Sequence, residues 1–216
     1  HNQPDGAAYA DPLEMAERVQ AARATAGIGM TILPTLYRFS GFGERPPEHA
    51  QLRFVTDPDA FVQRLARLAA ATRDDPLTAV GAALHSLRAV APQDPRTIAD
   101  SAATIARDMP IHIHVAEQTA EVEACQSAHG QRPVAFLLDR ARVDSRWCII
   151  HATHMDEGET RALAATGAVA GLCPTTEANL GDGMFQLAAY RDDGGRCAIG
   201  SDSHVVLDPR AELRLL

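Results

Sequence analysis

The chain contains no lysine, and all of its 20 basic residues are arginine. A protein without lysine side chains cannot form a Schiff base through them or use an amine as a nucleophile. The net charge of -8 gives no support to binding of nucleic acids or anionic membranes. The sequence also has no signal peptide and no long uninterrupted apolar stretch. These features predict a cytoplasmic protein that acts on a small molecule and has neither a nucleic acid nor a membrane as partner.

The four cysteines are widely spaced and form no C-x-x-C pair. Three of them lie in or beside apolar, strand-like runs, so we interpret all four as buried reduced thiols of a cytosolic protein. The cysteines are Cys125, Cys148, Cys173 and Cys197.

Neither end of the chain resembles a natural terminus. The first residues have turn chemistry but no start methionine, and residues 211–216 stop inside an apolar segment. We therefore expect residues 1–216 to be one catalytic domain, given as a fragment truncated at both ends.

Short apolar strands alternate with amphipathic helices along the sequence, which indicates a parallel sheet. Three helices begin at an Asp-Pro pair, with aspartate as the N-cap and proline at the first helical position. Strands are expected at residues 29–37, 77–84, 111–118, 147–153, 168–172 and 197–201. Helices are expected at residues 11–25, 57–72, 94–107, 121–130, 133–140, 156–166 and 185–190.

Polar residues gather directly after one expected strand after another. A closed barrel would bring these strand ends into one ring, whereas an open sheet would spread them along an edge. No glycine-rich phosphate fingerprint follows any strand, which argues against a dinucleotide-binding fold. We predict an α/β fold, a partial TIM (β/α)8 barrel with about six of its eight strands present and the N-terminal strands missing. The polar residues are Arg38, His85, Arg88, His114, Glu117, His151, His154, Glu177, Asn179, Asp202 and His204.

Three of these residues form a candidate metal site. His114, His151 and Asp202 each stand at the C-terminal end of a different expected strand. Imidazole and carboxylate ligands suit zinc or a similar divalent ion, and a catalytic site needs an open position for water. Glu117 lies beside this site and is free to move protons.

The motifs at these strand ends resemble the amidohydrolase superfamily over nearly the whole chain. His114-Val-Ala-Glu117, His151-Ala-Thr-His154 and Gly200-Ser-Asp-Ser203 are similar to its strands five, six and eight. The runs 173–183, 85–88 and 37–42 are similar, more narrowly, to the formimidoylglutamate deiminase family. Those enzymes hydrolyse N-formimidoyl-L-glutamate to N-formyl-L-glutamate and ammonia in histidine degradation.

The resemblance implies a role for each matching residue. His114 and Asp202 would bind one divalent metal ion, with zinc as the first candidate and iron or manganese also compatible. Asp202 would also take a proton from the bound water, and Glu117 would pass a proton to the departing nitrogen. His151 would polarise or stabilise the reacting centre. The family also makes a homodimer an option.

Two residues of one loop are candidates for substrate binding. The carboxylates of formimidoylglutamate need cationic or hydrogen-bonding partners. Arg88 offers a bidentate guanidinium, and His85 is a second contact on the same loop. In the run 173–183, we interpret Glu177 and Asn179 as structural residues near the pocket, although capping of a turn would also explain them.

The sequence departs from the superfamily pattern at one point. The first two metal ligands of the superfamily come from a His-x-His pair after strand one, and no such pair precedes His112. His112-Ile-His114 is itself a His-x-His pair, but it stands at the strand-five position. The isolated fragment is therefore expected to be inactive.

Two alternatives stay open from the sequence. One is a related amidohydrolase that deaminates a purine, pyrimidine or triazine ring, which would not need a carboxylate clamp at Arg88. The other is a metal-free, non-catalytic remnant, which metal analysis would reveal.

Overall fold

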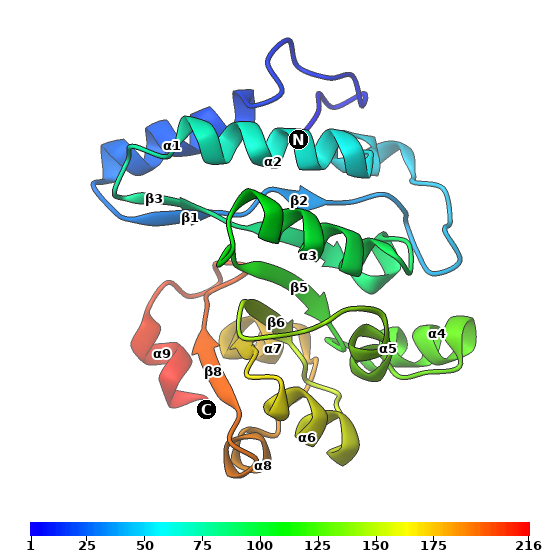
Figure 1. The fold of residues 1–216 in the computed structure, drawn as a ribbon. Coiled ribbons are helices and arrows are strands. Elements are labelled where there is room, and N and C mark those ends of the chain that lie inside the picture. The colour runs from blue at the N-terminus through cyan, green and yellow to red at the C-terminus, as the bar shows by residue number, and fades with distance from the viewer. The chain divides into compact units, whose positions relative to one another are not determined.

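The computed structural model describes residues 1–216 and divides them into two compact units. The N-terminal unit spans His1–His112, and the C-terminal unit spans Ile113–Leu216. Strand β5 (Ile111–Val115) crosses the boundary and is shared by both units (Figure 1).

The N-terminal unit contains two pairs of parallel strands and three α-helices. Strand β1 pairs with β3, with Met30 opposite Thr78, and β2 pairs with β4, with Leu36 opposite Leu84. The elements of this unit, in chain order, are α1 (Glu14–Ala26), β1 (Met30–Ile32), β2 (Thr35–Leu36), η1 (His49–Phe54), α2 (Pro58–Ala71), β3 (Thr78–Val80), β4 (Ala82–Ser86), η2 (Leu87–Ala89) and α3 (Asp94–Ile105).

Each of the first two expected strands is split into two shorter ones. Pro34 separates β1 from β2, because proline has no amide hydrogen to continue a ladder. Gly81 separates β3 from β4, where its amide donates to the Ile32 carbonyl at 2.9 Å. A Cβ at Gly81 would lie 2.6 Å from a Leu33 methyl carbon and 2.8 Å from the Pro110 carbonyl oxygen. Only glycine fits this close approach of the chain segments.

The first helix begins later than the Asp-Pro rule predicts. Helix α1 starts at Glu14, and Asp11 instead accepts a hydrogen bond from the Leu13 amide at 2.8 Å in a turn before the helix. The rule is confirmed at Asp57, which caps α2 by accepting from the Asp59 and Ala60 amides. A small apolar core formed by Leu13, Ile32 and Leu68, with Ala16, Met30 and Val80 packed against it, joins the helices to β1 and β3.

The C-terminal unit continues the alternation of strands and helices. Strand β6 pairs in parallel with β7, which pairs in parallel with β8; Ala170 of β7 lies opposite Ile149 on one side and Cys197 on the other. The elements of this unit after β5 are α4 (Thr119–His129), α5 (Pro133–Arg140), β6 (Trp147–His151), α6 (Glu157–Ala165), β7 (Val169–Leu172), α7 (Pro174–Leu180), α8 (Leu187–Asp192), β8 (Arg196–Ile199) and α9 (Pro209–Arg214).

The sheet has the strand order of a barrel segment. Six strands are hydrogen-bonded in the order β2-β4-β5-β6-β7-β8, which follows the chain. Consecutive parallel neighbours joined by helices are typical of a (β/α)8 barrel, whereas a doubly wound sheet reverses its order. The predicted α/β fold with six parallel strands of a partial barrel is confirmed.

Two short helices were not expected from the sequence. Residues 174–180 form α7 directly after β7, and residues 209–214 form α9 near the C-terminal end. Of the helices, none combines the length and the apolar composition needed to span a membrane. All four cysteines are free; Cys125 and Cys173 are buried, but Cys148 and Cys197 are only half-buried.

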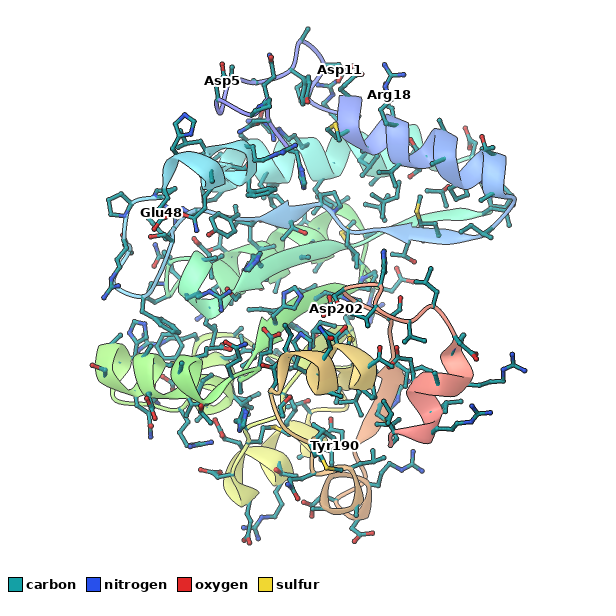
Figure 2. All side chains as sticks on the ribbon, turned by 180° about the vertical axis from the view of Figure 1, so that it is seen from behind. Asp5, Asp11, Arg18, Glu48, Tyr190 and Asp202 are labelled. Atoms are coloured by element: carbon teal, nitrogen blue, oxygen red, sulfur yellow. The ribbon has the colours of Figure 1, made fainter.

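Tyr190 of α8, which is labelled in Figure 2, packs in the interior of the C-terminal unit. Its side chain is fully buried, and its hydroxyl donates to the Ala168 carbonyl at 3.3 Å. Burial raises the pKa of Tyr190 to about 12. The ring lies so close to the backbone at Gly195 that a Cβ there would be 2.4 Å from ring carbons.

Candidate metal and catalytic site

The candidate site begins at the carboxyl ends of β5 and β6. His151, the last residue of β6, has a φ of 66°, and Ala152 and Ala116 have φ values of 50° and 54°. The Ala152 amide donates to the Val115 carbonyl at 3.0 Å and so ties the two strand ends together. Left-handed backbone at non-glycine residues costs free energy and concentrates at functional sites. Here it turns the side chain of His151 into the protein, where only 1% of the residue is exposed.

Three carboxylates surround the imidazole of His151. On one side, Nε2 lies 3.6 Å from Glu117 Oε1 and 3.9 Å from Asp202 Oδ2. On the other side, Nδ1 lies 3.1 Å from Glu177 Oε1. The ring of His114 stacks on that of His151, with centroids 5.6 Å apart and an interplanar angle of 27°. The structure therefore brings together all four residues that the sequence analysis assigned to the metal and to catalysis.

The pKa of His151 is set by two opposing effects, burial and the nearby carboxylates. Desolvation by burial lowers the pKa of its imidazole, because the interior disfavours the charged form. The hydrogen bond to Glu177 and the negative charges of Glu117, Glu177 and Asp202 act in the opposite direction and prevail. The net effect raises the pKa of His151 above its usual value.

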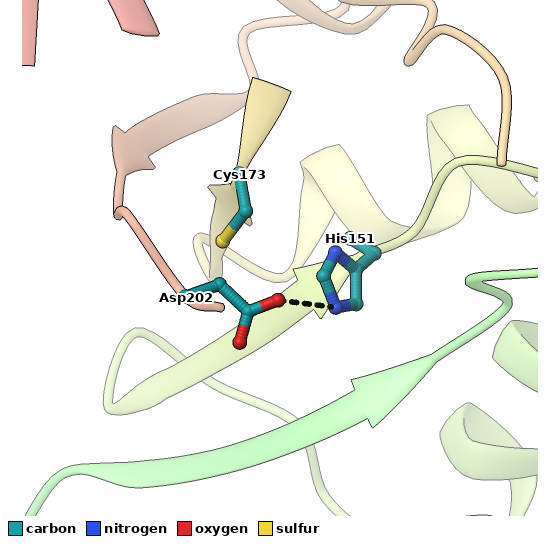
Figure 3. Close-up of side chains that lie close together, drawn as sticks. All are labelled: His151, Cys173 and Asp202. Carbon is teal, nitrogen blue, oxygen red and sulfur yellow. Dashed lines mark ion pairs between the residues drawn. The ribbon is translucent and has the colours of Figure 1, made fainter. Parts of the chain in front are cut away.

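Cys173 is a member of this cluster that the sequence analysis interpreted only as a buried thiol. The ligand atoms of His151, Cys173 and Asp202 all lie within 4.8 Å of one another (Figure 3). Burial, reinforced by the nearby charge of Asp202, raises the pKa of the Cys173 thiol to about 12. Its position directly after β7 follows the pattern of polar residues at strand ends and was the available signal.

The donor set fits a divalent metal ion. His114 and His151 offer imidazole nitrogens and Asp202 offers carboxylate oxygens, which are ligands that zinc and similar ions accept. The side chain of Asp202 is 34% exposed and that of Glu117 is 20% exposed. Both carboxylates are therefore partly open to solvent.

The segment that carries Asp202, which is labelled in Figure 2, is held to α7 by hydrogen bonds. Asp202 has a φ of 40°, which is unusual for a non-glycine residue. The hydroxyl of Thr176 lies 2.9 Å from that of Ser203 and accepts from the Ser203 amide at 3.2 Å. Thr176 thus fixes the residue next to Asp202.

The predicted substrate-binding residues lie in the N-terminal unit. His85 stands near the end of β4, where its ring meets that of Tyr37 edge-on at 5.0 Å, and its Nδ1 lies 3.0 Å from Ser86 Oγ. Arg88 follows in η2, and its charge opposes the desolvation that raises the pKa of Tyr37. Tyr37, His85 and Arg88 are therefore neighbours, while Arg38 forms an ion pair with the buried Asp94 at 2.9 Å. The contacts of His85 and Arg88 with substrate stay predictions.

Comparison with known proteins identifies relatives of this chain. The model of the family described as "Amidohydrolase family" matches residues 8–215. Formimidoylglutamate deiminase of Pseudomonas aeruginosa is 49% identical to this chain over 100% of the chain and 47% of its own length. The chain thus spans about half the length of that curated relative.

Two solved structures of similar proteins share the fold of this chain. The crystal structure of an amidohydrolase from Brucella melitensis has a TM-score of 0.91 and 47% identity, covering 98% of this chain and 46% of the other. An adenosine deaminase from Xanthomonas campestris, solved with bound zinc, has a TM-score of 0.76 and 26% identity, covering 92% of this chain and 43% of the other.

Proposed function

The chain belongs to the amidohydrolase family, and we propose that it carries the catalytic residues of a metal-dependent formimidoylglutamate deiminase. The proposed reaction is hydrolysis of N-formimidoyl-L-glutamate to N-formyl-L-glutamate and ammonia. The observation that carries the proposal is the convergence of Glu117 and Asp202 on Nε2 of His151, with His114 stacked on the same ring. The similarity to the Pseudomonas aeruginosa deiminase supports the choice of substrate.

We propose that His114 and Asp202 bind one divalent ion, and zinc is the first candidate because the Xanthomonas campestris relative contains it. When bound, such an ion lowers the pKa of water from about 15.7 toward about 7 and so supplies a nucleophile at neutral pH. The carboxylate of Asp202, which is open to solvent, accepts the first proton of the attacking water.

Glu117 and His151 complete the reaction. Water adds to the formimidoyl carbon, the bond from that carbon to the terminal nitrogen breaks, and both protons of the water end on the departing ammonia. Glu117 delivers a proton to this nitrogen, because ammonia is a poor leaving group until it is protonated. Nε2 of His151 lies near both carboxylates and stabilises the charge that develops on the reacting centre.

Arg88 and His85 are proposed to recognise the glutamate part of the substrate. A guanidinium binds a carboxylate through two parallel hydrogen bonds, and an imidazole adds one more donor. Tyr37 lies against His85 and restricts its ring. This recognition distinguishes formimidoylglutamate from a purine, pyrimidine or triazine ring, which carries no carboxylates.

The test measures ammonia release and bound metal together on the complete protein. We expect one bound divalent ion and faster release of ammonia from formimidoylglutamate than from adenosine, cytosine or a triazine. Preference for a ring substrate would replace the proposal with the ring-deaminase alternative. A protein with neither bound metal nor ammonia release would be the non-catalytic remnant.

The compartment and assembly of the enzyme are further parts of the proposal. The four free cysteines support a reducing compartment, so we propose the cytoplasm. The resemblance to the family supports a homodimer. Light scattering on the complete protein, as it elutes from a size-exclusion column, would test this by measuring its molar mass.

A further inference from the structure

We infer that Glu177 is a positioning residue that fixes the ring proton of His151 on Nδ1 and so directs Nε2 toward the reacting groups. The inference rests on the proposed role of His151 in catalysis. It concerns a residue whose sequence pattern indicated only a structural role.

One oxygen atom of Glu177 faces both a backbone amide and His151. Oε1 accepts a hydrogen bond from the Cys173 amide at 2.9 Å and lies 3.1 Å from Nδ1 of His151. An oxygen that accepts from a backbone amide presents lone pairs, so the nitrogen that faces it must donate. Nδ1 of His151 therefore carries a proton.

Because both partners are buried, this hydrogen bond favours one tautomer of His151 over the other. Glu177 is 4% exposed and His151 is 1% exposed, so water cannot replace either partner. The opposite tautomer would point a nitrogen lone pair at a carboxylate oxygen in a buried site, which is unfavourable. The hydrogen bond that one ring nitrogen makes sets the state of the other.

The consequence appears at Nε2. Because Nδ1 keeps its proton for Glu177, Nε2 is the ring nitrogen left to act on the substrate, and it faces Glu117 and Asp202 at 3.6 Å and 3.9 Å (Figure 3 shows the contact with Asp202). Both distances exceed an ordinary hydrogen bond, so Nε2 is available to a reacting group. A ring whose only proton lay on Nε2 would lose the hydrogen bond to Glu177 and with it this fixed orientation.

Helix α7 keeps Glu177 in place through its neighbours. Thr175 donates from its amide and its hydroxyl to Glu212, at 2.9 Å and 2.6 Å. Thr176 contacts Ser203, next to Asp202, as described above. Three consecutive residues of α7 thus reach α9, the Asp202 segment and His151. The helix positions both the imidazole and the carboxylate of the proposed site.

Nitrogen-15 NMR of the histidine rings tests the inference without any measurement of activity. The spectra are recorded at a pH at which the ring of His151 is neutral. Because the chain has nine histidines, the signals of His151 are identified by their loss in His151→Gln. We expect the proton on Nδ1 in the unaltered chain and a shift of the population toward Nε2 in Glu177→Ala. In Glu177→Gln, whose amide oxygen can still accept, the Nδ1 proton should be retained.

Glu159→Gln is the matched control. Glu159 is also buried and also accepts backbone amide protons, from Val134 and Ala135, but its contacts lie away from α7 and His151. We expect this variant to lower stability and leave the His151 tautomer unchanged. A proton on Nε2 in the unaltered chain would overturn the inference even if Glu177→Ala did not fold. An unchanged tautomer in a folded Glu177→Ala would overturn it as well.

A second measurement uses the complete protein and the proposed reaction. Partners that orient an active-site histidine are typically worth roughly 10- to 100-fold in activity. We expect Glu177→Ala to lower kcat by this factor with an unchanged KM and an unchanged metal content, and Glu177→Gln to recover part of the loss. Failure of the unaltered protein to release ammonia would contradict the proposed function and leave the NMR result to decide the tautomer. A loss confined to KM would contradict the positioning role.

Discussion

At the scale of single residues, the site consists of acidic groups placed around one buried imidazole. Glu117, Glu177 and Asp202 come from different elements, yet each lies within 4 Å of a nitrogen of His151. We expect their functions to differ because their exposure differs. Glu177 is enclosed, which suits it to orienting the ring, whereas the more exposed Glu117 and Asp202 are the proposed sites of proton exchange with a substrate.

Glu117→Gln should lower kcat in the complete protein by roughly 100- to 10,000-fold, the usual contribution of a general acid or base. The amide keeps the size of the side chain but cannot deliver a proton to the departing nitrogen. Ammonia release under saturating substrate measures the loss, and metal analysis should find the ion retained. The exposed Glu123 of α4 supplies the control, since Glu123→Gln should retain full activity. Equal activity of the two variants would remove Glu117 from the mechanism.

Arg88→Ala should raise the KM for formimidoylglutamate with little change in kcat. Hydrogen bonds to charged groups are worth about 1.5–3 kcal/mol, which corresponds to a rise of roughly 10- to 100-fold. Steady-state kinetics of the complete protein measure it. Arg96→Ala is the control, because the side chain of Arg96 is 78% exposed on α3 and pairs only loosely with Asp100. An unchanged KM for Arg88→Ala would end the carboxylate-clamp assignment.

Tyr190 should make the chain less stable at high pH. Its pKa is raised from 10.0 to about 12 in the folded state, so the unfolded chain loses the phenolic proton first as the pH rises. By linkage, stability is complete below pH 10 and falls as the pH rises toward 12, by up to about 2–3 kcal/mol. Urea unfolding at a series of pH values measures this loss, which should be smaller in Tyr190→Phe. The same pH dependence in both proteins would show that other groups cause it.

At the scale of elements, the sequence predicted the existence and order of the six strands but not their interruptions. The apolar runs are regular enough to show each strand, whereas the breaks at Pro34 and Gly81 depend on which segment lies opposite. Helix α7 was missed because its seven residues are too few for a helical period, although Pro174 stands at its first position. That omission also concealed the contact of Glu177 with His151.

Gly195→Ala should destabilise the C-terminal unit by about 1–3 kcal/mol, the usual cost of overpacking. The new methyl group would lie 2.4 Å from the ring of Tyr190, which is fully buried and has no room to move away. Urea unfolding measures the change. At Gly29 the nearest atom is 3.7 Å from an added Cβ, so Gly29→Ala is the control and should cost much less. Equal stability of the two variants would contradict the packing described for Tyr190.

At the scale of the whole molecule, the sequence predicted the site better than it predicted the contacts that support the site. Strand alternation indicated which residues stand at the carboxyl ends of strands, and a parallel barrel brings such residues together. The grouping of His114, Glu117, His151 and Asp202 around one ring was predicted in this way, and their roles stay predictions. The direction of a side chain after the strand ends is set by local backbone, such as the left-handed φ of His151 and Asp202, and this was not readable from spacing.

Metal binding should link the proposed site to the stability of the complete protein. An ion that binds only the folded state raises the free energy of unfolding by about 2.7 kcal/mol when its concentration is 100 times its Kd. Chelation should therefore lower the Tm and abolish ammonia release, and added zinc should restore both. His114→Ala should lose the response of the Tm to zinc, whereas the control His49→Ala, at an exposed residue of η1, should keep it. A zinc response that persists in His114→Ala would show that the ion is bound elsewhere, because a site that uses His114 as a ligand cannot retain its affinity without that imidazole.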